Sequence, residues 1–133
     1  MIDLAAARAG IGAALRTVDG LHVYERAVDG PIELPAAVLG LVETDWDTGP
    51  CTTDMTAIPV AVAVAHDGMN EAATQEQLET LWVLAAEAMR SHLEVSPLAD
   101  VGVARTMPRS MPGSLDVAGQ SHPAYVTTIE IHG

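Results

Sequence analysis

The chain has 133 residues, a length that suits one domain with its own hydrophobic core. Hydrophobic residues make up 49% of it and the mean hydropathy is positive, which excludes disorder as the main state. Eighteen acidic residues against six arginines give a net charge of −12, which disfavours nucleic-acid or membrane-surface binding because phosphates would be repelled.

The first predicted element is a helix that follows Asp3, a residue able to cap it. Its apolar residues recur at spacings of three and four and define one face: Leu4, Ala7, Ile11, Leu15 and Val18. Gly20 is predicted to end this segment. A short strand over 21–26 and a turn over 29–31 follow, and a second strand, apolar on both faces, is predicted over 36–43.

The segment 57–65 has the clearest strand pattern. Larger side chains alternate with alanines, so that Ile58, Val60, Val62 and Val64 share one face. The alanine face allows another element, or another subunit, to approach closely. Pro59 has no N–H to donate, so it is predicted to lie at an edge or near the strand start.

A second helix is predicted over 74–93, with Thr74 and Gln77 as a capping box. Strands are predicted over 101–106 and 124–132. The predicted fold is α+β, with two helices packed on one face of a mostly antiparallel or mixed sheet in a single domain, 1–133. The predicted core joins helix residues to strand residues: Leu78, Leu81, Trp82, Ala85 and Met89 to Ile58, Val60, Val62, Val64, Tyr125, Ile129 and Ile131.

The sequence contains no complete catalytic, cofactor-binding or metal-binding motif. The five histidines are scattered, and Cys51 has no neighbouring base in the sequence to lower its pKa. Asp45-Trp46-Asp47-Thr48-Gly49 resembles the start of a calcium loop but has Thr56 where the loop needs a glutamate. We therefore expect no enzyme activity, no cofactor and no metal site. No apolar run is long enough to span a membrane, and the N-terminus is not predicted to be a signal peptide.

In the order and residue pattern of its segments, the chain resembles the tail-terminator (tail-completion) proteins of long-tailed, non-contractile bacteriophages. The resemblance is strongest to Ala-rich members from actinobacterial hosts. The resemblance is carried by Leu15-Arg16-Thr17-Val18, Leu21-His22-Val23-Tyr24, Leu34-Pro35-Ala36-Ala37-Val38, Ile58-Pro59-Val60-Ala61-Val62, the helix 74–93, Val101-Gly102-Val103-Ala104 and the strand from Tyr125 to Ile131. It implies a structural protein, usually a homo-hexameric ring, at the head-proximal end of the tail tube. Such a ring stops tube polymerisation and joins the tail to the head.

The same resemblance implies the partners and the location. The ring would contact the tail-tube protein and a head-closure or neck protein, and DNA would pass through it without specific binding. The protein would be made in the host cytoplasm and reside in the virion at the head–tail junction. Three alternatives stay open: another small neck protein, a small α+β enzyme or ligand-binding domain, and a dimeric adaptor.

Two predicted loops, 43–54 and 107–114, are expected to carry the subunit and partner contacts. Both are long for connections and hold residue types that interfaces favour. Arg105 and Arg109, in or near the second loop, are expected to pair with Asp45, Asp47 or Asp54 of the first loop on the next subunit. Such pairs would offset the repulsion between acidic copies. The predicted interface residues are Asp45, Trp46, Asp47, Asp54, Arg105, Met107, Arg109 and Met111.

Overall fold

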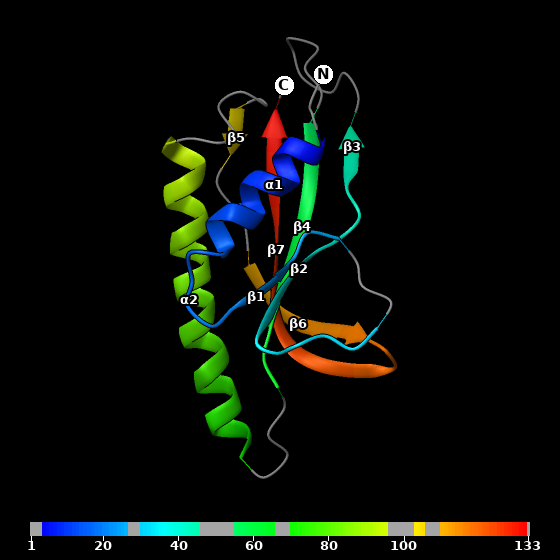
Figure 1. Ribbon diagram of the computed structural model, residues 1–133, viewed down its shortest axis with the longest axis vertical. Coiled ribbons are helices and arrows are strands. Elements are labelled where there is room, and N and C mark those ends of the chain that lie inside the picture. The colour runs from blue at the N-terminus through cyan, green and yellow to red at the C-terminus, as the bar shows by residue number, and fades with distance from the viewer. Residues whose placement is uncertain are drawn as a thin grey trace.

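The computed structural model describes residues 4–26, 30–45, 55–65, 70–95, 103–105 and 110–132. Each of the two helices in this part of the chain is followed by a run of strands (Figure 1). The elements are α1 (Leu4–Leu15), β1 (His22–Tyr24), β2 (Ala36–Leu39), β3 (Glu43–Asp45), β4 (Met55–Ala63), α2 (Glu71–Val95), β5 (Val103–Arg105), β6 (Ser110–Val117) and β7 (Gln120–His132).

The strands form one mixed sheet around a central antiparallel pair, β4 and β7. On one side of this pair, β2 and β3 both lie along β4, and β1 adds to β2 in parallel. On the other side, β5 and β6 both lie along β7 and are antiparallel to it. The fold is therefore α+β with a mixed sheet, which confirms the predicted class.

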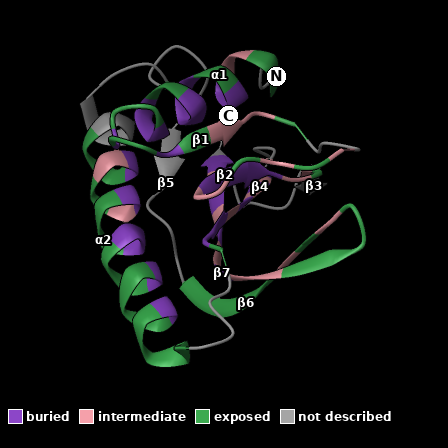
Figure 2. Cartoon of the chain, turned by 60° about the horizontal axis from the view of Figure 1, so that its bottom comes forward, coloured by how far each residue is buried: buried purple, intermediate pink, exposed green. Residues whose placement is uncertain are grey.

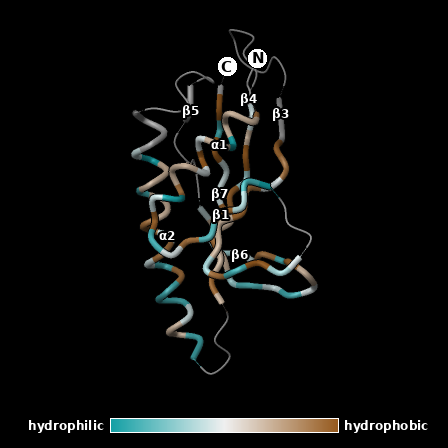
Figure 3. The backbone as a smooth tube through the Cα atoms, in the orientation of Figure 1, coloured by the Kyte–Doolittle hydropathy of each residue, from teal (hydrophilic) through white to brown (hydrophobic). Residues whose placement is uncertain are grey.

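Both helices pack on the same face of the sheet (Figure 2). The larger side chains of β4 are fully buried beneath them, and so are Ile129 and Ile131 of β7. The Trp82 ring of α2 stacks on the Tyr125 ring of β7 with centroids 5.7 Å apart. Hydropathy follows this arrangement, because β4 is largely brown whereas teal recurs along α2 (Figure 3). The predicted core is thus confirmed.

The start of α2 differs from the prediction. Its cap is Asn70, whose Oδ1 accepts a hydrogen bond from the Ala73 N–H at 3.0 Å. Thr74 lies inside the first turn, where its hydroxyl donates to the Asn70 carbonyl. The predicted Thr74–Gln77 capping box is therefore wrong, because the helix begins three residues earlier at Glu71 and a carboxamide at Asn70 already satisfies the first amides.

The predicted strand 36–43 is interrupted. The register of β2 and β3 along β4 shifts by one residue between Leu39 and Glu43, which is a β-bulge. Pro59 lies opposite this bulge, in the middle of β4, and its carbonyl accepts from the Gly40 N–H at 2.8 Å. The prediction that Pro59 lies at an edge or strand start is therefore wrong. The interior position is tolerated because its missing N–H faces the interruption between β2 and β3.

Two segments predicted as loops contain strands. Glu43–Asp45 is β3, and Ser110–Val117 is β6, which forms a hairpin with β7. The hairpin turn uses Ala118 and Gly119 with φ of 52° and 77°, the positive values that a tight two-residue hairpin turn requires. β7 consequently begins at Gln120, earlier than the predicted strand. The long predicted loops are thus partly sheet edges, which fixes the backbone of several predicted interface residues.

Candidate subunit interface

Three of the predicted interface residues lie in strands of the structure. Asp45 is the last residue of β3 and pairs with Met55, whereas Arg105 is the last residue of β5 and pairs with Glu130. Met111 lies in β6, and 49% of its surface is exposed. The others fall outside the described residues: Trp46, Asp47, Asp54, Met107 and Arg109.

Asp45 and Arg105 lie on opposite edges of the sheet. β3 and β5 are separated by β4 and β7, so about 14 Å divides the two edge strands. The intervening strands prevent direct pairing between these edges within one copy. If the predicted pairing of an acidic edge with an arginine edge forms, it has to join two different copies.

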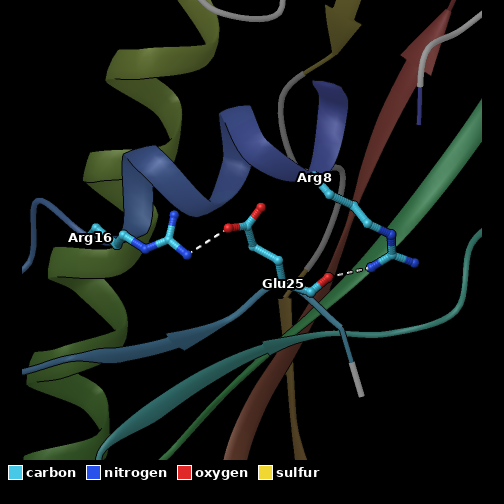
Figure 4. Close-up of polar contacts among 3 residues, drawn as sticks. All are labelled: Arg8, Arg16 and Glu25. Atoms are coloured by element: carbon cyan, nitrogen blue, oxygen red, sulfur yellow. Dashed lines mark hydrogen bonds and ion pairs between the residues drawn. The ribbon is translucent and has the colours of Figure 1, made fainter. Parts of the chain in front are cut away.

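Among the described side chains, Arg8 and Arg16 make polar contacts within the chain (Figure 4). Arg8 of α1 is 9% exposed and donates to two carbonyls, that of Glu25 at 2.8 Å and that of Gly40 at 2.7 Å. Arg16 pairs with the Glu25 carboxylate at 2.6 Å. Arg8 therefore fastens α1 to the end of β1 and to the β2–β3 bulge, and it positions the sheet edge that carries Asp45.

Large apolar side chains are exposed at both sheet edges and on α2. Leu41, in the bulge between β2 and β3, is 86% exposed, the highest fraction among the large apolar residues of the described segments. Met111 lies at the opposite edge of the sheet. Val83 and Leu84 are exposed on α2. Exposed apolar side chains at both edges favour protein contacts there.

A shallow hollow lies between α2 and the chain before β2. Its volume is about 440 Å³, and Pro35, Leu81 and Leu84 supply apolar lining while Glu76, Gln77 and Thr80 supply polar groups. The hollow offers a surface for packing and no arrangement that points to a reaction.

Among the described residues, no three metal-ligating side chains are grouped closely enough to hold an ion. The His22 ring lies 3.2 Å from the Glu33 carboxylate at the surface. Cys51 and the residues of the calcium-loop-like segment after Asp45 lie outside the described part of the chain. In that part, no helix has the length and apolarity needed to cross a membrane.

No protein-family model matches the chain, and no curated protein sequence matches it.

The sequence interpretation missed Leu41 as an interface candidate. The predicted strand 36–43, apolar on both faces, includes Leu41 and so favours its burial. The available signal was Gly40: a glycine inside a strand pattern often marks a bulge or a close approach of backbone. A Cβ at Gly40 would lie 2.9 Å from the Pro59 ring, so this close approach is real.

Proposed function

We propose that the protein is a structural subunit of a bacteriophage tail terminator, which assembles as a closed homo-oligomeric ring at the head-proximal end of a tail tube. The family resemblance of the sequence supplies the hypothesis. The observation that supports it best is that the sheet has two different edges on opposite sides of one copy, with no further strand beyond either edge among the described residues. Contacts between unlike surfaces are heterologous, and such contacts generate rings when the rotation closes.

The charge distribution is compatible with this role. A chain of net charge −12 that forms a ring surrounds its axis with negative potential, which disfavours tight binding of DNA phosphates. A conduit needs this property, because DNA must slide through it. The ring would bind the tail-tube protein on one face and a head-closure or neck protein on the other.

Electron microscopy of the purified protein, with its solution mass measured in parallel, tests the ring. The proposal predicts closed rings, usually of six copies. A particle that is a two-fold dimer at all concentrations would contradict it, since two copies joined by one like-to-like contact cannot close a tube.

The terminating activity is tested by adding the protein to tail-tube protein that is polymerising. The expected result is tubes that stop growing and carry a ring at one end. Tubes of unchanged length with no bound protein would overturn the proposed function even if the purified protein forms rings.

A further inference from the structure

Two hollows lie end to end along one side of α2. The first, of about 440 Å³, lies between α2 and Pro35, and the second, of about 450 Å³, lies between α2 and residues 17–19, just after α1. Leu84 lines both hollows, so they form one groove, which we call the α2 groove. Its lining runs along α2 from Ala73 to Ser91, a length of about 27 Å at the helical rise per residue.

The α2 groove is apolar at its centre. The Leu84 side chain is 51% exposed, although Leu81 beside it is buried in the core. Pro35 lines one end of the groove and Val18 the other, so apolar surface continues to both sides of Leu84. A straight groove of this length beside a helix fits a second helix, whose apolar side chains recur at spacings of three and four along one face.

The rim of the α2 groove is acidic. Glu76, Glu87 and Asp19 line it, whereas no arginine, lysine or histidine does so among the described residues. α2 as a whole has five glutamates and one arginine. Other hollows of similar size differ, because the one of about 490 Å³ beside Leu34 and the start of β7 has His122 and no carboxylate among its described lining. The acidic rim therefore favours an occupant with positive charge.

We propose that the α2 groove binds a basic amphipathic helix of a partner protein. The apolar face of that helix covers Leu84, and its lysines or arginines pair with the acidic rim. A second copy of this chain is a poor occupant, because its own α2 would bring five more glutamates to the rim. The inference goes beyond the proposed ring and does not depend on it, since one copy contains the whole groove.

Two synthetic helices of opposite charge test the occupant. Both have about 18 residues, the length of the groove, with leucines at spacings of three and four and with either lysine or glutamate elsewhere. Fluorescence anisotropy of each labelled helix, titrated with the chain, measures its Kd. We expect the lysine helix to bind at least about tenfold more tightly, and its Kd to rise with salt as the rim charges are screened. Equal binding of the two helices, or no binding of either, would overturn the proposal.

Leu84→Ser tests where the helix binds. The Kd of the lysine helix should rise about tenfold, because the substitution removes the apolar centre of the groove without adding charge. Val83→Ser is the matched control, since Val83 is 54% exposed on the same helix and lines neither hollow. It should change the Kd by less than about twofold. Equal weakening by the two substitutions would show that the helix does not bind in the groove.

Glu87→Gln tests the role of the rim. Removing one carboxylate charge while keeping the size of the side chain should raise the Kd of the lysine helix about threefold. Glu79→Gln removes the same charge from an exposed residue of α2 that does not line the groove and that accepts a hydrogen bond from Gln75 at 3.2 Å. Its effect should be smaller. Equal effects would show attraction to net charge alone and overturn the proposed site.

Self-association is measured on the same variants by analytical ultracentrifugation. Wild-type chain and Leu84→Ser should have the same mass, because the groove is not a contact between copies. A loss of association in Leu84→Ser would identify a second copy as the occupant and overturn the proposal. Rings that terminate tubes but do not bind the lysine helix would reject this inference alone. Binding of the lysine helix by a chain that leaves tube length unchanged would support this inference and reject the proposed function alone.

Discussion

Apolar side chains differ in exposure between two regions of the molecule. They are buried in the layer between the helices and the sheet, and they are exposed at the two sheet edges. In the layer, Ile58, Val60 and Val62 are fully buried under α1 and α2. At the edges, Leu41 and Met111 remain exposed although they are equally apolar. The first region stabilises one copy, and the second is available to another copy. Substitutions should therefore separate folding from assembly.

The largest loss of stability is expected in the layer, for Trp82→Ala. The indole is 8% exposed and stacks on Tyr125, so its removal deletes buried area and leaves a cavity. We expect the free energy of unfolding to fall by about 3 to 5 kcal/mol, measured by urea denaturation. Val83→Ala, on the exposed side of the same helix, is the control and should change little. Equal effects of the two substitutions would show that the α2 stripe is not buried as described.

Arg8→Met should have the next largest effect. The variant keeps an apolar stem but leaves the carbonyls of Glu25 and Gly40 without their charged donor. A loss of about 2 to 3 kcal/mol is expected. Arg16→Ala removes an exposed ion pair and should cost about 0.5 kcal/mol. If both arginines contribute the same small amount, the link between α1 and the bulge does not hold this sheet edge.

Gly40→Ala should destabilise the bulge by about 1 to 3 kcal/mol, because the new methyl group would meet the Pro59 ring at 2.9 Å. Gly30→Ala is a suitable control, since a methyl group there contacts nothing within 4 Å. Adding Pro59→Ala to Gly40→Ala removes the ring and should recover part of the loss. Thermal melting of the four variants measures this coupling, and strictly additive effects would contradict it.

The smallest effect on stability, and the largest on assembly, is expected at the edges. Leu41→Asp changes a side chain that is 86% exposed, so the free energy of unfolding should change by no more than about 0.5 kcal/mol. The same variant should lose its rings, because a further carboxylate at this exposed position would repel a neighbouring acidic copy. Analytical ultracentrifugation and urea denaturation of one sample measure both quantities. Rings of normal stability would show that this edge is free in the assembly.

The sequence predicted the buried layer well and the edges poorly, for physical reasons. Alternation in 57–65 and the stripe on α2 report burial directly, so Val60, Trp82 and Ile129 were assigned correctly to the core. Strand pairing at an edge depends on long-range register that local patterns do not encode. Local patterns therefore predict loops over Glu43–Asp45 and over residues 110–114 of β6, where the structure has strands. The opposite placement of Asp45 and Arg105 became visible only through the sheet order.

The length of tails in cells infected by a virus that lacks this chain tests the central claim most directly. If the protein terminates the tube, its absence should give abnormally long tails without heads, and the chain supplied in trans should restore tails of uniform length with heads attached. Leu41→Asp supplied in the same way should fail to restore them. Tails of normal length joined to filled heads in the absence of the protein would contradict the account.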